Sequence, residues 1–232
     1  MIRAFGVLNP LFEDARLTNR AITGRNIPFP GQFLLDAEHV VVAKAFTGDL
    51  RHRASGTLLV QHRFGADPSD PSVELVTDEL RATISLSSRS VFGGQEVGVL
   101  AVVTIAPGWY CYGAPAGASY TPLSIVFDDP LIVDQVLDLP AATRIEGGEE
   151  ELFAHRGELR AVGRIRIAWN PVSVSAGNDH DRAPAIPTGE RRLRGRLEYQ
   201  ACDGQTCLPP RRIPFELPLD IRPNLAYRLP DS

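Results

Sequence analysis

The sequence predicts a mainly β protein in which an antiparallel β-sandwich follows a small, separate N-terminal segment. Short apolar strands with turn residues between them recur from Val73 onward. No long amphipathic helix interrupts this series, which is typical of a sandwich. The stretch GADPSDPS at 65–72 combines proline, glycine and small polar residues, as linkers do. We therefore predict an N-terminal segment over 1–65, a linker over 66–74 and the sandwich over 75–225.

Composition limits the classes of function. Apolar residues make up 44% of the 232 residues and aromatic residues 7%, which suits a soluble domain with a core. The net charge of −4 gives no indication of nucleic-acid binding. The most apolar run, VGVLAVVTIAP at 97–107, is about half the length of a membrane-spanning helix. We expect neither a nucleic-acid partner nor membrane insertion.

The N-terminal segment contains a hairpin. IPFPGQFLLDAEHVVVAKAF at 27–46 reads as two apolar strands around a polar turn at Asp36–His39. A helix is expected next, although Gly56 weakens its pattern. Its apolar face would hold three leucines, namely Leu50, Leu58 and Leu59.

The sandwich strands are expected over seven ranges, namely 80–88, 95–106, 120–129, 131–140, 158–172, 192–201 and 211–223. A polar loop over 178–187 interrupts them. The last two strands alternate apolar and polar residues and flank CDGQTCLPP, which is therefore the connection of the closing hairpin.

That connection holds two of the three cysteines, Cys202 and Cys207. Facing residues of an antiparallel pair have Cα atoms about 4.5–5.5 Å apart, and a disulfide accepts about 4.4–6.8 Å. A bridge is therefore geometrically reasonable. The short polar loop, with Asp203 and Gly204, should leave both sulfurs near solvent, and exposed disulfides tend to be the exchanging ones.

A purely structural role is the alternative for this pair. Closing a loop of about six residues stabilises a fold by only about 2 kcal/mol, against nearly 5 kcal/mol for about 100 residues. The C-x4-C spacing alone leaves both roles open. Zinc is disfavoured because no second pair of ligands has metal spacing. We expect no metal and no cofactor.

The segment LEYQACDGQTCLPP resembles the active-site segment of the N-terminal periplasmic domain of DsbD, the bacterial transmembrane thiol–disulfide reductase. The YQ-x-C…C-x-PP pattern of that family is matched by Tyr199, Gln200, Cys202, Cys207, Pro209 and Pro210. APGWYCYGAP at 106–115 is similar to the family's Gly-aromatic-Tyr-x-Tyr strand, with Tyr110 and Tyr112 at the tyrosine positions.

This resemblance implies an immunoglobulin-like sandwich that relays electrons by thiol–disulfide exchange with thioredoxin-fold partner proteins. It also implies that Cys207 joins the partner and that Cys202 resolves the mixed disulfide. Arg211 and Arg212 would favour a thiolate, whereas Asp203 would oppose it.

The DsbD family also has an acidic and aromatic cap loop over its cysteines. The candidate here is EGGEEELFAH at 146–155, through Glu150, Glu151 and Phe153; a solvated acidic turn is the alternative. Cys111 stands between the two tyrosines of the YCY strand, and strand neighbours alternate in direction. We expect it to be a buried free thiol.

The hairpin at 27–46 resembles the second half of a thioredoxin-fold, peroxiredoxin-like domain. Pro30 matches the cis-proline before the strand Gln32–Asp36, although any hairpin that begins with proline would look similar. Residues 1–65 contain no cysteine, so this partial domain lacks a catalytic thiol. An incomplete domain exposes strand edges, so we expect it to pack on the sandwich or to form a homo-oligomer.

The leading hypothesis is therefore a dithiol–disulfide relay through Cys202 and Cys207. The alternatives are a non-catalytic sandwich that binds a partner and a regulatory module of a redoxin fusion, with the disulfide only structural. The N-terminal residues do not resemble a secretory signal. We expect a cytoplasmic protein if the sequence is complete and, by the family resemblance, a periplasmic one if it is truncated.

Overall fold

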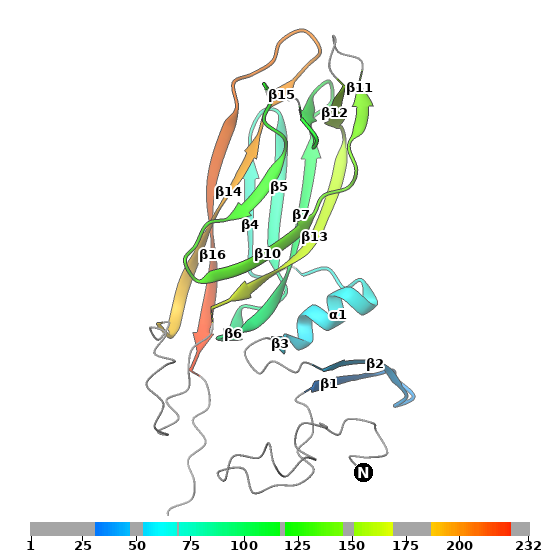
Figure 1. Cartoon of the computed structure of the whole chain (residues 1–232), viewed down its shortest axis with the longest axis vertical. Helices are drawn as coiled ribbons and strands as arrows, with labels where there is room; N and C mark the ends of the chain where they lie inside the picture. Colours follow the sequence, from blue (N-terminus) through cyan, green and yellow to red (C-terminus); the bar gives the residue numbers. More distant parts are fainter. Residues whose placement is uncertain are drawn as a thin grey trace, which may run out of the picture. The chain divides into compact units, whose positions relative to one another are not determined.

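The computed structural model describes residues 31–46, 53–68, 70–116, 119–145, 151–168 and 187–223. The chain divides into two compact units, Met1–Arg53 and Ala54–Ser232. The described part of the first unit is a hairpin, and that of the second is a sandwich with one helix (Figure 1). The short strand β3 (Arg53–Ala54) falls at the boundary in the sequence.

The hairpin of the first unit consists of β1 (Gly31–Leu35) and β2 (Val41–Phe46), paired antiparallel. Its turn is closed by the Asp36 carboxylate, which accepts the backbone N–H groups of Glu38 and Val40 at 3.1 and 2.8 Å. The predicted hairpin is thus confirmed. Its assignment to a partial thioredoxin-like domain stays a prediction.

The helix α1 (Gly56–Phe64) belongs to the second unit, although the predicted N-terminal segment ran to residue 65. The reason is its packing on β7: Leu58 is buried, and the Gln61 side chain donates to the Val99 carbonyl at 3.2 Å. Gly98 allows this, because a Cβ there would lie 1.8 Å from Oε1 of Gln61.

The ends of α1 follow from its sequence. The Ser55 hydroxyl accepts the backbone N–H of Leu58 at 3.1 Å, and Gly65 ends the helix in the left-handed region with φ of 63°. Gly56 is the first helical residue, so it does not interrupt the helix as the pattern had suggested. Leu58 lies on the buried face as expected, and Leu50 is outside the described residues.

The larger sheet has the strand order β10-β13-β7-β5-β4, and all its neighbours are antiparallel. The strands in this order are β4 (Ser72–Val76), β5 (Leu80–Leu86), β7 (Gln95–Ile105), β10 (Ile132–Asp138) and β13 (Glu158–Ile167), and β3 pairs with β7 beside them. The strand β4 begins inside the predicted linker over 66–74, where a short apolar pattern next to prolines gave little signal.

The facing sheet has the order β6-β16-β14-β9, in which only the β6–β16 pair is parallel. Its strands are β6 (Ser90–Phe92), β9 (Ser124–Phe127), β14 (Gly189–Tyr199) and β16 (Arg211–Arg222). The strands β14 and β16 pair without a break from Gly189↔Ile221 to Tyr199↔Arg211. They are the two strands that the sequence placed around the cysteines.

The main core lies between these two sheets. Alternate side chains of β13, β14 and β16 are buried, as a sheet with one covered face requires. Fully or almost fully buried members come from both sheets and include Ile84, Val99, Ile165, Leu197 and Leu217. The predicted mainly β sandwich is confirmed.

A third, small sheet has the order β11-β12-β8-β15. Its strands are β8 (Tyr110–Tyr112), β11 (Thr143–Ile145), β12 (Leu152–His155) and β15 (Ala201–Cys202). It lies at the end of the sandwich opposite α1, beside the connection from β15 to β16 (Figure 1). Among the described residues, no helix has the length and apolar character needed to cross a bilayer.

Candidate functional site: a disulfide beneath a short loop

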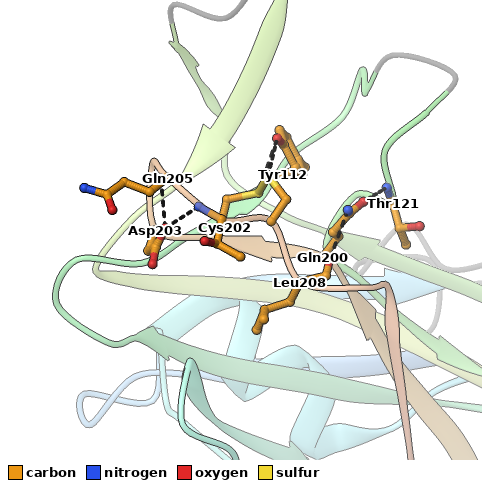
Figure 2. Close-up of a disulfide and its surroundings, with 9 residues drawn as sticks. Tyr112, Thr121, Gln200, Cys202, Asp203, Gln205 and Leu208 are labelled. Atoms are coloured by element: carbon orange, nitrogen blue, oxygen red, sulfur yellow. Dashed lines mark hydrogen bonds between the residues drawn. A yellow bond between two sulfur atoms is a disulfide. The ribbon is translucent and has the colours of Figure 1, made fainter.

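Cys202 and Cys207 form a disulfide, with 2.04 Å between the sulfurs and 4.2 Å between the Cα atoms (Figure 2). Cys202 ends β15, and the two residues face each other as an antiparallel bridge. The facing positions predicted for the mouth of the closing hairpin are therefore confirmed. The register also places Cys202 opposite Tyr110 of β8.

The two cysteines differ in burial. Cys202 has no exposed surface, because Tyr112 and Leu152 cover it in a small apolar cluster. Cys207 is exposed in the loop. The expectation that both sulfurs lie near solvent is thus wrong for Cys202, since β15 brings it under the third sheet.

The loop between the cysteines is held by Asp203. Its Oδ1 accepts the backbone N–H groups of Gln205 at 2.8 Å and Thr206 at 2.7 Å. These hydrogen bonds lower the pKa of the Asp203 carboxyl, so it stays ionised at neutral pH. Gly204 supplies the positive φ of 94° that the turn requires. The loop therefore has a defined shape and carries a negative charge next to Cys202.

Pro209 and Pro210 are exposed and lie between the loop and β16. They have no N–H to donate, and β16 begins directly after them, at Arg211, as the sequence suggested. Before the prolines, the Leu208 N–H donates to the Ala201 carbonyl at 2.9 Å. Leu208, directly after Cys207, is thus hydrogen-bonded to β15, and Thr206, directly before it, accepts the Asp203 N–H at 3.2 Å.

The Tyr112 hydroxyl lies 3.4 Å from both sulfur atoms. Disulfide sulfurs carry no hydrogen, so the hydroxyl is the donor. Burial raises the pKa of Tyr112, and the neighbouring hydroxyls of Tyr110 and Tyr120 raise it further. Tyr112 therefore keeps its proton at neutral pH and remains a donor to sulfur.

Two further tyrosines surround Tyr112. The ring of Tyr120 lies 4.3 Å from it between centroids, and that of Tyr110 lies 5.7 Å away, edge to face. The Arg156 guanidinium lies 4.6 Å above the Tyr110 ring. Tyr110 thus packs against the small cluster that contains Cys202. Tyr120 and Arg156 were not predicted, because nothing in their local sequence relates them to the cysteines.

Gln200 connects the cysteine loop to the segment that precedes β9. Its amide nitrogen donates to the Leu208 carbonyl at 3.1 Å, and its Oε1 accepts the Thr121 N–H at 3.2 Å (Figure 2). These contacts fix the position of the segment after Cys207. Gln200 is therefore a supporting residue of the loop.

Tyr199 lies elsewhere. Its ring is fully buried in the main core, and its hydroxyl donates to the Glu79 carboxylate at 3.1 Å. Strand alternation explains this, since Tyr199 and Gln200 point to opposite faces. Tyr199 supports the base of the hairpin instead of lining the disulfide.

The two arginines after the prolines are paired with carboxylates. Arg211 lies 3.4 Å from Glu79, and Arg212 lies 3.0 Å from Glu198. Each arginine thus has a carboxylate partner, although Glu198 also pairs with Arg196 at 2.7 Å. This pairing weakens the expectation that the two arginines favour a thiolate at Cys207.

The predicted cap segment is only partly described. Glu150 lies outside the described residues, and the exposed Glu151 pairs with Arg144 at 3.2 Å. Phe153 is half-buried, and its backbone carbonyl accepts the Gly113 N–H at 2.8 Å. The residue of this segment that packs with Cys202 is Leu152, which the sequence did not single out.

Cys111 is a buried free thiol, as expected. Its side chain belongs to the main core, whereas Tyr112 and Cys202 belong to the small cluster. Burial and the nearby charge of Glu79 raise the pKa of Cys111 to about 12. It stays protonated at neutral pH and cannot compete as a nucleophile.

Within the described ranges, no group of three or more His, Cys, Asp or Glu side chains is arranged to hold a metal ion. The chemistry available at the site is therefore that of the disulfide and of the tyrosine hydroxyl beside it.

No family model and no curated protein matches the sequence. The structure is similar to the N-terminal periplasmic domain of ScsB from Proteus mirabilis, with 18% identity and a TM-score of 0.42 over 64% of this chain and 50% of that one. It is also similar to the N-terminal domain of Neisseria meningitidis DsbD in the reduced form, with 16% identity and a TM-score of 0.33 over 53% of this chain and 78% of that one. The chain thus spans half the length of the ScsB structure.

Proposed function

We propose that the protein exchanges its Cys202–Cys207 disulfide with the dithiol of a redox partner protein of the thioredoxin fold. The observation that carries this proposal is the unequal burial of the two sulfurs. Cys207 is exposed, whereas Cys202 has no exposed surface. The partner class comes from the resemblance of the cysteine segment to DsbD.

The exchange proceeds in two substitutions at sulfur. A partner thiolate attacks Sγ of Cys207, the bond between the two cysteines breaks, and Cys202 leaves as a thiolate with the bonding electron pair. The second partner thiolate then attacks the partner sulfur of the mixed disulfide and releases Cys207 as a thiolate. Two electrons have then passed from the partner dithiol to this pair, and the partner holds a disulfide. The reverse sequence oxidises the pair.

Tyr112 would assist the first substitution. Its hydroxyl lies 3.4 Å from Sγ of Cys202 and keeps its proton. A hydrogen bond to the departing thiolate stabilises the charge that develops on this sulfur in a site closed to water. Attack at Cys207 therefore leaves the negative charge on Cys202, which this hydroxyl reaches. The hydroxyl lies at the same 3.4 Å from Cys207, so burial, and not the hydroxyl, distinguishes the two sulfurs.

A structural disulfide explains the geometry less well. The arms of the loop are already paired along the whole of β14, so a covalent bond adds little beyond about 2 kcal/mol. A structural role also gives no reason for one sulfur to be exposed.

The proposal is tested by equilibrating the protein with mixtures of reduced and oxidised glutathione and measuring the fraction of disulfide by thiol alkylation and mass spectrometry. We expect a reduction potential above about −300 mV, in the range of exchange proteins. A Cys207→Ser variant that folds should transfer no electrons to a thioredoxin-fold acceptor. A pair that stays oxidised in every mixture, with a potential below about −300 mV, would make the disulfide structural.

A further inference from the structure

One buried residue, Glu79, contacts the three chain segments that build the disulfide site. Glu79 lies in the turn between β4 and β5 of the larger sheet and is 2% exposed. The segments are the two arms of the cysteine loop and the turn before β8. The two arms are paired with each other in one sheet, whereas the turn leads into β8 of another sheet, so the position of the turn relative to the arms does not follow from one strand ladder.

The Glu79 carboxylate holds both arms of the loop through one oxygen. Its Oε2 accepts the Tyr199 hydroxyl at 3.1 Å and Nη1 of Arg211 at 3.4 Å. Tyr199 and Arg211 are the final register pair of β14 and β16, immediately before the chain diverges into the loop. The carboxylate thus holds both arms to the opposite sheet at the last residue pair before the loop. The distance between the arms at this pair determines the distance between the two cysteines.

The backbone of Glu79 holds the third segment. Its carbonyl accepts the Ala106 N–H at 2.8 Å, and the Ala106 carbonyl accepts the Trp109 N–H at 3.1 Å. This turn leads directly into β8, which carries Tyr110 and Tyr112. Glu79 therefore contacts both arms of the loop and also the turn that leads to Tyr112, the tyrosine beside the sulfurs.

The carboxylate is ionised in this position. Burial by itself raises the pKa of Glu79, but hydrogen bonds from Thr77, from its own backbone and from Tyr199, together with the charge of Arg211, lower it below the ordinary value of a glutamate. The ion pair with Arg211 is thus present throughout the neutral range.

We propose that Glu79 is a positioning residue that holds the arms of the cysteine loop at the bridging distance and so sets the balance between disulfide and dithiol. This inference rests on the proposed function of the pair. Reactive groups that are held close together combine more readily than groups that are free to separate. Loosening the arms therefore shifts the equilibrium toward the two thiols and makes the disulfide easier to reduce.

The test uses the variant Glu79→Gln, which keeps the side-chain volume and an acceptor for Tyr199 but removes the charge that pairs with Arg211. The protein is equilibrated with mixtures of reduced and oxidised dithiothreitol, and the disulfide fraction is measured by alkylation. We expect the equilibrium constant for disulfide formation to fall by about three- to tenfold. Glu216→Gln is the matched control: it breaks the exposed Arg192 pair on the same two strands and should leave the constant unchanged.

A merely structural role gives a different result. The midpoint temperature of unfolding would then fall equally in the oxidised and reduced variant. The equilibrium constant for disulfide formation would equal that of the wild type, and this result would overturn the inference. If circular dichroism shows that Glu79→Gln does not fold, Arg211→Gln decides, because Arg211 is 46% exposed and its loss leaves Tyr199 bonded to Glu79. A wild-type disulfide that glutathione does not reduce would contradict only the proposed exchange. Equilibration with dithiothreitol would still measure the effect of Glu79 on the equilibrium between disulfide and dithiol.

Discussion

The main core and the disulfide end of the sandwich are built on different principles. The main core joins aliphatic side chains of both sheets, and many of them have no exposed surface. The disulfide end, formed by Cys202, Tyr112 and Leu152 with Tyr110 and Tyr120 around them, contains hydroxyl groups and borders the exposed Cys207. Solvent is excluded from the main core. At the disulfide end, solvent is excluded from Cys202 but reaches Cys207.

This difference separates stability from reactivity. A close-packed aliphatic core resists any change of volume. The disulfide end keeps one sulfur under apolar and aromatic cover and leaves the other within reach of another molecule. Changes in the first region should therefore affect unfolding in both redox forms, whereas changes in the second should affect exchange with little loss of stability.

The largest effect on stability is expected from Leu217→Ala in the main core. Leu217 is fully buried on β16, so its truncation should lower the free energy of unfolding by about 2–5 kcal/mol. Denaturant unfolding of the oxidised and the reduced protein measures this, and the loss should be the same in both. The matched control is Val162→Ala at a 40% exposed position of β13, where the loss should stay below about 1 kcal/mol. Equal losses at the two sites would contradict the assignment of the core.

A smaller effect, confined to exchange, is expected from Tyr112→Phe. The ring and its packing on Tyr120 are kept, and only the hydroxyl beside the sulfurs is lost. The rate of disulfide reduction by dithiothreitol, followed by quenched alkylation, should fall by about tenfold, as expected when one donor to a developing negative charge is removed. Tyr120→Phe is the control, because no hydrogen bond from Tyr120 to a sulfur is found in the described part of the chain. An unchanged rate in Tyr112→Phe would remove the hydroxyl from the mechanism.

Much of this architecture could be predicted from the sequence. The alternation of apolar and polar residues predicts the long strands β14 and β16, because a strand with one buried face has an apolar side chain at every second position. The connection between them was therefore identified as the cysteine loop, and the two prolines set the first residue of β16. Cys111 was correctly separated from the site by the same alternation.

Other features depend on contacts between distant segments. Tyr199 lies within the cysteine motif, yet its hydroxyl is bonded to Glu79, which is far away in the sequence. Leu152 and Arg156 reach the site because β12 pairs with β8, a short ladder that no local pattern predicts. The burial of Cys202 has the same origin, since β15 pairs with β8 instead of continuing into open loop.

The reactivity of each cysteine alone tests the central claim most directly. In Cys202→Ser the remaining thiol is the exposed Cys207, and in Cys207→Ser it is the covered Cys202, while Cys111 is the same in both. We predict that Cys207 reacts with 5,5′-dithiobis(2-nitrobenzoic acid) at least about tenfold faster than Cys202, in proportion to its accessibility. Equal rates, or a faster reaction of Cys202, would contradict the account in which Cys207 is the sulfur that a partner attacks.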